Sequence, residues 1–472
     1  MVFRSAAQER LGGLLGLVLG MLACAPAPDG FRDPRHVIFI SMDTTRADHL
    51  GFMGNDRIQT PRLDELTARS IVFEDCMTVA PTTLASHTSL FTGKYPHSHG
   101  TPRNGFLVNP KNVMLAEVLG DAGFHTAGFA GSFALHSRFA FAQGFDHYDE
   151  TFDQRVGEGG VDQNQRSAAV VTDAVRDYLA LTGIPERLFL FVHYFDPHRP
   201  YAAPEPFATA YDPDGRDALP DIESIRRDRG LTPGERQQAG RRQMLQYAAE
   251  ISFMDEQIGR LLDVLDASGV LDEALLVLTS DHGENLLERS PIFDHGNSVY
   301  RAMTDAVCAI RLPGGRGATR VPGTMATIDI LPSVLALLDI PAPEGVQGET
   351  IDLEEHPLEI EPRTRFAQAT KPWDQVETDP RWTNLRKARC IRDGRYKLIQ
   401  VPYLGTEELY DLQEDPEETV NLLDAGDPPA ITGILRRRLE VWAESADPLP
   451  SHFMRGRRDE NIERLRSLGY VE

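Results

Sequence analysis

The chain has 472 residues, of which 41% are hydrophobic. This composition predicts a large buried core, organised as one large domain with a smaller one, or as three domains. The formal net charge is −23 at pH 7, which argues against a nucleic-acid-binding protein because such proteins present a basic surface. An acidic protein that acts on an anionic substrate needs local cations, so a bound metal ion is already favoured.

Residues 1–24 have the features of a signal peptide of the lipoprotein type. Residues 11–23 are almost wholly apolar, and this run is shorter than the ~20 residues of a membrane span. Residues 21–24 read Met-Leu-Ala-Cys and resemble a bacterial lipobox with Cys24 as the lipidated residue. We expect a protein of the bacterial cell envelope, periplasmic or held to the outer membrane by this lipid. The alternatives are a plain signal peptide cleaved near Ala23 or Ala25, and an uncleaved anchor.

Residues 25–35 form a linker rich in proline and glycine, and a regular alternation of strands and helices follows. Continuous apolar runs predict three buried strands, at 36–43, 188–194 and 275–280, and each run is followed by charged or histidine residues. Apolar residues at helical spacing predict a helix over 251–265. Strands alternating with helices predict an α/β fold with a large, mostly parallel sheet flanked by helices. Its sites should lie at the carboxyl ends of the strands.

A second unit is predicted after residue 372, which gives a catalytic domain over 36–372 and a small C-terminal α+β subdomain and tail over 373–472. Short strands at 389–392, 396–400 and 408–411 with a helix at about 434–443 predict a small antiparallel sheet with one helix. Residues 204–242, rich in Pro, Gly, Asp and Arg, are either an insertion over the active face or a solvated loop.

Three cysteines follow the signal segment: Cys76, Cys308 and Cys390. Their number is odd, and a chain of this size does not depend on disulfides. We expect all three to be buried thiols.

Residues 80–97 read Ala-Pro-Thr-Thr-Leu-Ala-Ser-His-Thr-Ser-Leu-Phe-Thr-Gly-Lys-Tyr-Pro-His. They resemble the nucleophile segment of the sulfatase family, in the alkaline phosphatase superfamily, which reads Cys/Ser-x-Pro-x-Arg before a short helix ending in Leu-Thr-Gly-Arg-Tyr-Pro. The resemblance covers roughly residues 36–445. It implies the alkaline-phosphatase-like fold of sulfatases and a hydrolase that acts on anionic esters.

This alignment puts Thr83 in the nucleophile position and His87 in the arginine position. Threonine cannot be oxidised to the formylglycine of sulfatases, so the resemblance implies that the Thr83 hydroxyl itself attacks the ester, activated by a metal or a base. Thr82 is the nearest alternative nucleophile, and an ordinary helix N-cap is the structural alternative. His87 would orient Thr83, bind the ester oxygens or cap the same helix.

Two segments at strand ends carry the metal prediction. Asp43 ends the first strand, and Asp281-His282 follows the strand at 275–280. The resemblance implies that Asp43, Asp281 and His282 hold a divalent cation, with the Thr83 hydroxyl completing the site. Two carboxylates, an imidazole and an alkoxide suit Ca, Mn or Zn. Taken singly, these residues could also be a helix cap and a turn.

Histidines supply the remaining candidates. His198 and His295 resemble the family histidines that bind the substrate and protonate the leaving group. His193 is expected to be a buried sheet histidine. His97, His99 and Asn104 follow the nucleophile helix in the chain and could border the pocket.

The chain departs from the family at residues 127–132, which read Ala-Gly-Phe-Ala-Gly-Ser where typical sulfatases carry Gly-Lys-Trp-His. The missing lysine weakens the expectation of a sulfate monoester. Threonine nucleophiles on this scaffold belong to phosphodiesterases and to phosphotransferases acting on membrane lipids or glycans, often with two metals. Asp196, His198 and His295 could form the second site. A non-catalytic relative that binds anionic glycans is a further alternative, against which the intact metal ligands argue.

Overall fold

The computed structural model describes residues 34–152, 164–213, 219–220, 222–227, 230–315, 319–355, 358–360, 362–372, 386–454 and 464–465. The predicted signal peptide and all but the last two residues of the predicted linker lie outside these ranges. Within the described residues, no helix is both long enough and apolar enough to cross a membrane.

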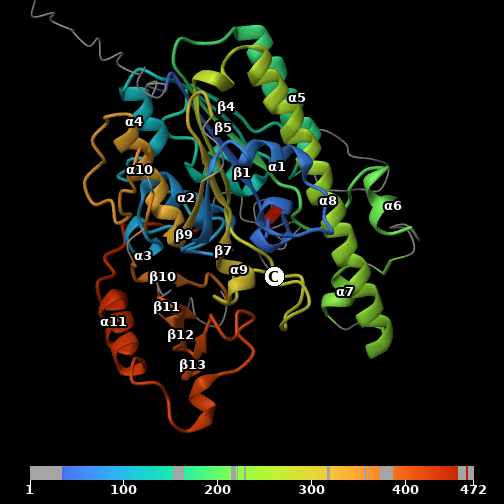
Figure 1. The fold of residues 1–472 in the computed structure, drawn as a ribbon, viewed down its shortest axis with the longest axis vertical. Coiled ribbons are helices and arrows are strands. Elements are labelled where there is room, and N and C mark those ends of the chain that lie inside the picture. The colour runs from blue at the N-terminus through green and yellow to red at the C-terminus, as the bar shows by residue number, and fades with distance from the viewer. Residues whose placement is uncertain are drawn as a thin grey trace, which may run out of the picture. The chain divides into compact units, whose positions relative to one another are not determined.

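A large sheet forms the centre of the fold (Figure 1). Most neighbouring strands run parallel, and the antiparallel pairs all involve strands β2, β7 and β8. This confirms the predicted α/β fold. In spatial order the strands are β4 (His147–Asp149), β3 (His125–Phe129), β5 (Leu188–Tyr194), β1 (His36–Met42), β6 (Ala274–Ser280), β8 (Cys308–Arg311), β2 (Ile71–Met77) and β7 (Asp305–Ala306), and β9 (Thr319–Ala326) pairs with β2.

The register of the central strands determines where the chemistry lies. Met42, the last residue of β1, pairs with Tyr194 at the end of β5 and with Ser280 at the end of β6. The residues that follow these strands therefore emerge at one edge of the sheet. This register brings Asp43 and Asp281 together from positions far apart in the sequence.

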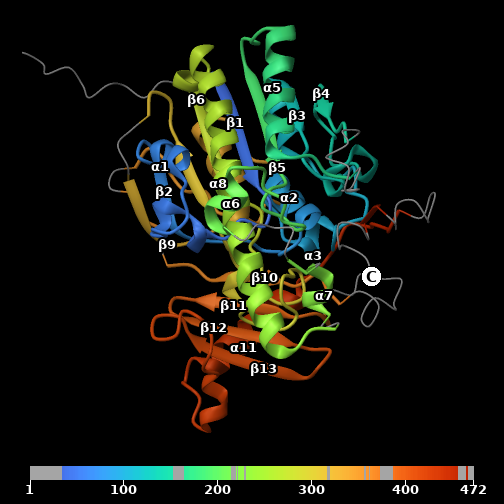
Figure 2. The same cartoon turned by 90° about the vertical axis from the view of Figure 1, so that its right-hand side faces the viewer.

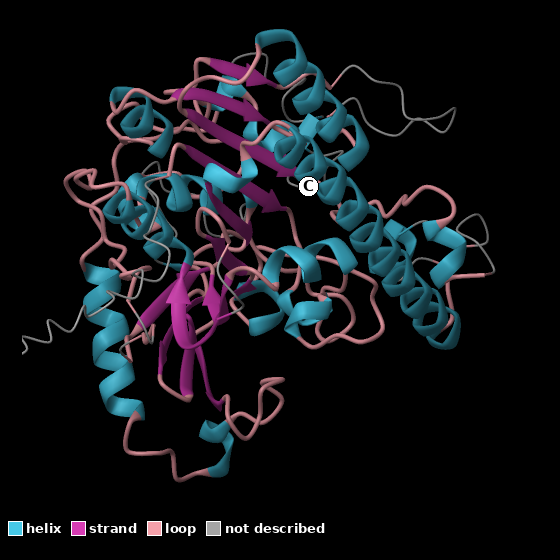
Figure 3. Ribbon diagram, turned by 45° about the horizontal axis from the view of Figure 1, so that its top comes forward, coloured by secondary structure: helices cyan, strands magenta, loops and turns pink. Residues whose placement is uncertain are grey.

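Helices cover both faces of the large sheet (Figure 3). On one face, Ile38 and Ile40 belong to the same hydrophobic cluster as buried residues of α5 (Ala168–Thr182) and α8 (Pro233–Ala267), which run beside the strands in Figure 2. On the other face, the ring of Phe39 packs against Phe91 of α2 (Thr83–Thr92). Shorter helices of the large domain include α1 (Pro61–Thr67), α3 (Pro96–His99), α4 (Leu115–Asp121), α9 (Arg301–Thr304) and α10 (Ile330–Leu337).

The segment over 204–242 contains helices where it is described. It forms α6 (Phe207–Tyr211), α7 (Ile222–Arg226) and the first turns of α8. Thr232 begins α8 with a reciprocal capping box to Glu235. Arg226 forms an ion pair with Asp294, the residue before His295. The segment therefore reaches the active face, as the first of the two interpretations predicted.

The small C-terminal sheet has the predicted antiparallel order β10 (Arg365–Gln368), β11 (Arg389–Asp393), β12 (Tyr396–Val401) and β13 (Thr406–Asp411), with α11 (Thr432–Glu444) beside it (Figure 1). Strand β10 precedes residue 372 and pairs with β11 after it. The boundary at residue 372 stays a prediction. Cys76, Cys308 and Cys390 are buried and not in disulfides, as expected.

A buried glutamate, Glu418, joins the C-terminal sheet to the large domain. Lys397 Nζ lies 2.8 Å from Glu418 Oε1, and both side chains are buried. The other oxygen, Glu418 Oε2, accepts a hydrogen bond of 2.6 Å from the amide of Arg301 at the start of α9. Glu418 thus contacts Lys397 of the C-terminal sheet and the backbone amide of Arg301 in the large domain.

We expect Lys397→Met to lower the free energy of unfolding by about 3 kcal/mol or more, because it leaves Glu418 buried without its cation. Urea unfolding measures this change. The matched control is Arg395→Met, which removes an exposed partner of Asp411 and should hardly change the unfolding midpoint. An equal effect of both substitutions would contradict the assignment of Glu418 to the junction.

Candidate active site

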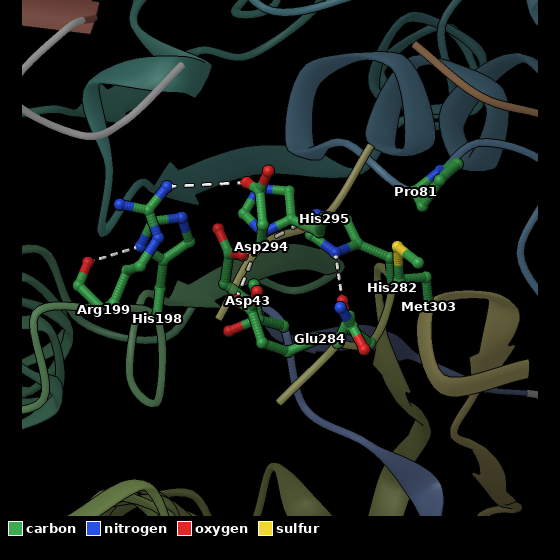
Figure 4. Close-up of polar contacts among 12 residues, drawn as sticks. Asp43, Pro81, His198, Arg199, His282, Glu284, Asp294, His295 and Met303 are labelled. Atoms are coloured by element: carbon green, nitrogen blue, oxygen red, sulfur yellow. Dashed lines mark hydrogen bonds and ion pairs between the residues drawn. The ribbon is translucent and has the colours of Figure 1, made fainter. Parts of the chain in front are cut away.

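Three predicted ligands meet at the edge of the large sheet. One ligand atom each from Asp43, Asp281 and His282 lies within 4.8 Å of the others, and all three residues are buried. His282 Nε2 is 3.4 Å from Asp281 Oδ2 and 3.9 Å from Asp43 Oδ1. Figure 4 shows Asp43 and His282 together with the neighbouring histidines.

The hydrogen bonds around these residues leave the converging atoms available. Asp281 Oδ1 accepts from the amides of Thr44 and His282, at 3.1 and 2.7 Å. His282 Nδ1 donates to the Gly283 carbonyl at 2.9 Å, so the lone pair of Nε2 faces the carboxylates. Asp43 Oδ1, Asp281 Oδ2 and His282 Nε2 have no hydrogen-bond partner among the described residues.

The electrostatics of this group call for a cation. Burial raises the pKa of Asp43 well above its usual value, and burial together with the charge of Asp43 does the same for Asp281. Burial also lowers the pKa of His282, which keeps it neutral. Two adjacent buried carboxylates cannot both be charged without compensation. A neutral imidazole and two acidic oxygens with free lone pairs fit a divalent cation.

Thr83 is the first residue of α2, which begins earlier in the chain than the helix over 86–91 that the sequence predicts. Its hydroxyl donates to Asp43 Oδ2 at 3.3 Å, so it adjoins the ligand group. The helix ends at Gly93 in the left-handed conformation, with φ of 64°. Thr82 turns away instead, because its hydroxyl bonds to the Pro81 carbonyl and to Thr370.

His87 links the nucleophile helix to the end of β1. Its Nδ1 lies 2.7 Å from the Thr83 carbonyl, and its Nε2 lies 2.8 Å from the Ser41 hydroxyl. Burial lowers the pKa of His87 well below its usual value. Both ring nitrogens are therefore engaged by the protein. This arrangement agrees with the orienting role among the predicted alternatives.

His193 does more than fill the sheet interior. Its Nδ1 accepts from the Gly131 amide at 3.2 Å, which places the proton on Nε2, 3.3 Å from Asp43 Oδ2. Burial lowers the pKa of His193 to about 3, so the ring is neutral. His87, His193 and Asp281 also have ligand atoms within 4.8 Å of one another. Because the nitrogens of His87 are already hydrogen-bonded, we interpret this second group as support for the first.

His198 and His295 lie together as predicted, whereas Asp196 faces elsewhere. The two imidazole rings are 5.2 Å apart, and His295 is 4.6 Å from the ring of His282. Asp196 Oδ2 accepts from the amide of Ala168 at the start of α5, at 2.8 Å. The candidate metal groups that the described residues form do not include the set Asp196, His198 and His295.

The remaining polar candidates divide into structural and site residues. The rings of His99 and His97 are held within the fold, His99 by Ser89 at 2.9 Å and His97 against Trp442 at 4.5 Å between centroids. Asn104 Oδ1 accepts from the amide of Leu84, the residue after Thr83, at 2.7 Å. Asn104 Nδ2 is buried without a hydrogen-bond partner in the described structure. Asn104 therefore borders the nucleophile.

Sequence reasoning missed several charged residues of this site. Glu284 Oε2 lies 3.2 Å from His295 Nδ1, and burial raises the pKa of Glu284 to about 7. Asp294 is paired with three cations, Arg199, Arg226 and Lys371. The sequence motifs indicated a role for none of these four residues. Glu284 and Asp294 could have been found because each lies within two residues of a predicted histidine. Arg199 follows the predicted His198 and could have been found in the same way, whereas Arg226 and Lys371 come from distant segments and gave no local signal.

Comparisons with known proteins agree with this geometry. The sulfatase family model matches residues 35–340, and the model of the C-terminal part of N-sulphoglucosamine sulphohydrolase matches residues 293–445. The ulvan-active sulfatase of Formosa agariphila is 28% identical over 413 residues, which cover 82% of this chain and 77% of that protein.

Two solved structures share the fold. The phosphonate monoester hydrolase of Silicibacter pomeroyi has a TM-score of 0.68 at 22% identity, covering 87% of this chain and 94% of that one. A protein in complex with its substrate D-glucosamine-2-N,6-O-disulfate has a TM-score of 0.70 at 20% identity, covering 88% and 99%. The chain therefore belongs to the sulfatase family, a family of ester hydrolases, as the nucleophile segment predicted.

Proposed function

We propose that this protein is a metal-dependent hydrolase of phosphate or sulfate esters in which Thr83 is the nucleophile, with phosphate esters as the better substrates. One observation carries the proposal. The Thr83 hydroxyl lies 3.3 Å from Asp43 at the start of a helix, beside three buried ligand atoms that lack hydrogen-bond partners. A protein that only binds its ligand has no need for a hydroxyl nucleophile beside buried metal-ligand atoms.

Asp43, Asp281 and His282 would hold a divalent cation, and the Thr83 hydroxyl would complete the site. When bound, the cation supplies positive charge that stabilises the oxyanions of the ester and of the nucleophile. Calcium, manganese and zinc all suit this ligand set. The unpaired amides at the start of α2 add to the attraction for an anion.

The protein residues account for the bond changes. Thr83 Oγ1 passes its proton to Asp43 Oδ2, forms a bond to phosphorus, and the bond from phosphorus to the leaving oxygen breaks. His198 and His295 are the candidate acids for that oxygen. Burial lowers the pKa of both rings in the free protein, and the negative charge of a bound ester favours their protonated forms. Water then attacks the phosphothreonine, and the bond from phosphorus to Thr83 Oγ1 breaks. Asp43 returns its proton to Thr83 Oγ1, a histidine accepts one proton of the water, and the other proton stays on the phosphate.

Two features favour phosphorus over sulfur. A sulfated threonine is a stable ester that lacks the elimination route of an aldehyde hydrate. Residues 127–132 contribute no lysine or histidine. Asn104, which accepts from the amide next to Thr83, offers a neutral Nδ2 donor without a hydrogen-bond partner among the described residues. Asn104 suits a non-bridging oxygen of a phosphodiester or phosphonate monoester.

Hydrolysis of sulfated glycans is the second candidate function. A relative that is 28% identical is named an ulvan-active sulfatase, and another, 23% identical, is an N-acetylglucosamine-6-O-sulfatase of Bacteroides thetaiotaomicron. These names favour an anionic glycan as the carrier of the ester. A phosphotransferase acting on membrane lipids or glycans stays an alternative for the same nucleophile.

Substitution of the nucleophile tests the mechanism. Thr83→Ala should lower kcat by about a thousandfold or more with the fold intact, and Thr83→Ser should keep part of the activity because the hydroxyl remains. Thr82→Ala is the matched control and should do little. Aryl phosphate, phosphodiester and sulfate esters should be assayed side by side. Fast sulfate turnover that survives in Thr83→Ala would refute both the nucleophile and the preference for phosphorus.

Metal analysis tests the ligand set independently of activity. Purified protein should contain a divalent metal, and Asp43→Asn or Asp281→Asn should lose most of it, because each removes a charged ligand from a buried site. Asp255→Asn is the control, since this carboxylate accepts the amides of Arg62 and Leu63 far from the site. Equal metal content in all variants would exclude these ligands.

We also propose that the protein is a lipoprotein of the bacterial cell envelope, on the basis of the apolar run ending at Cys24. Mass spectrometry of the mature chain should find a lipid on Cys24 and nothing before it. Cys24→Ser should move the protein from the membrane to the soluble fraction. A mature wild-type chain that begins elsewhere and is soluble would rule out the anchor.

A further inference from the structure

Three cations surround Asp294, the residue before His295. Asp294 Oδ1 lies 2.9 Å from Lys371 Nζ, 3.2 Å from Arg226 Nη2 and 3.7 Å from Arg199 Nη2. Burial alone would raise the pKa of Asp294, but these cations outweigh it and hold the pKa below its usual range. The carboxylate is therefore charged at every ordinary pH.

Glu223 is a second carboxylate beside these cations. It lies 3.2 Å from Arg199 Nη1 and 2.5 Å from Arg226 Nη1, it also pairs with Arg227, and its side chain is 37% exposed. Arg199 is only 5% exposed, yet its Nε and Nη2 make no hydrogen bond to any described residue. A buried guanidinium with unspent donors needs an explanation, because such groups are normally satisfied.

The cluster adjoins the proposed reaction centre. Arg199 directly follows His198, and Figure 4 shows Arg199, Asp294 and His295 together. The amide of Lys371 donates to the carbonyl of Gly296, next to His295, at 2.7 Å. The positive potential therefore extends to the side on which the leaving group would lie.

We propose that Arg199 and Lys371 form a subsite for a carboxylate on the leaving group of the substrate. This inference rests on the proposed function. A planar guanidinium whose Nε and Nη2 make no hydrogen bond to any described residue matches the two oxygens of a carboxylate. The substrate class is an ester of an acidic glycan, in which the alcohol released belongs to a uronate-containing chain. Arg226 positions Arg199 through their shared carboxylates.

A pair of small esters isolates this subsite. Phenyl phosphate and 3-carboxyphenyl phosphate release phenols of similar acidity, and only the second carries a carboxylate. The wild type should have the higher kcat/KM for the carboxylated ester, mainly through a lower KM. Arg199→Met and Lys371→Met should each reduce that kcat/KM by roughly 10- to 100-fold, and should affect phenyl phosphate much less. Arg199→Lys should restore part of the preference.

Arg227→Met is the matched control. Arg227 follows Arg226 and also pairs with Glu223, but its side chain is 53% exposed. This variant should treat both esters as the wild type does. Equal kcat/KM values of the wild type for the two esters, or an equal loss for both esters in the Met variants, would overturn the subsite.

Two further measurements separate this inference from its foundation. If the wild type hydrolyses no ester, the proposed function fails. The subsite can still be tested by calorimetry, which compares the affinity of the protein for 3-hydroxybenzoate with its affinity for phenol. Tighter binding of 3-hydroxybenzoate that is lost in Arg199→Met supports it, and equal binding overturns it. As competitors of 3-carboxyphenyl phosphate, oligogalacturonate should inhibit and phosphatidate vesicles should not. The reverse order would replace the glycan with a lipid surface and refute the proposal.

Discussion

Two buried carboxylates at neighbouring strand ends constrain the rest of this structure. Asp43 and Asp281 follow β1 and β6, whose last residues pair in the parallel register. Burial raises the pKa of both, so the fold keeps them together at an electrostatic cost that the proposed divalent cation would offset. His282 turns its lone pair towards them, and backbone amides hold one oxygen of Asp281.

Thr83, the proposed nucleophile, is coupled to the same carboxylates through the opposite face of the sheet. Ser41 and His193 pair across β1 and β5, so their side chains lie on the face that α2 covers. His87 bonds to Ser41 and to the carbonyl of Thr83, while His193 faces Asp43. A histidine at position 87 thus fixes the helix start by neutral hydrogen bonds, where the family pattern has an arginine. This substitution removes a permanent positive charge from the nucleophile side of the site.

The sequence allowed the fold and the centre of the site to be predicted because both depend on local patterns. Apolar runs ending in acids marked β1 and β6, and the spacing back from Thr92 put Thr83 in the nucleophile position near the start of a helix. The orientation of Asp196 could not be predicted, since the amide of Ala168 competes for its carboxylate from another element. Sequence spacing places a side chain near a site, but hydrogen-bond competition decides where it points.

The cations of the site escaped prediction for a related reason. Arg226 lies on α7 and Lys371 follows β10, and neither has a neighbour in sequence that indicates a ligand. They meet only because Asp294 offers a buried charge that both can reach. The sheet edge therefore supplies the reactive groups, whereas segments outside the large sheet supply the charge beside His198 and His295. Since loops and insertions tolerate change better than central strands, this division lets the chain alter what it binds without disturbing Asp43, Asp281 and Thr83.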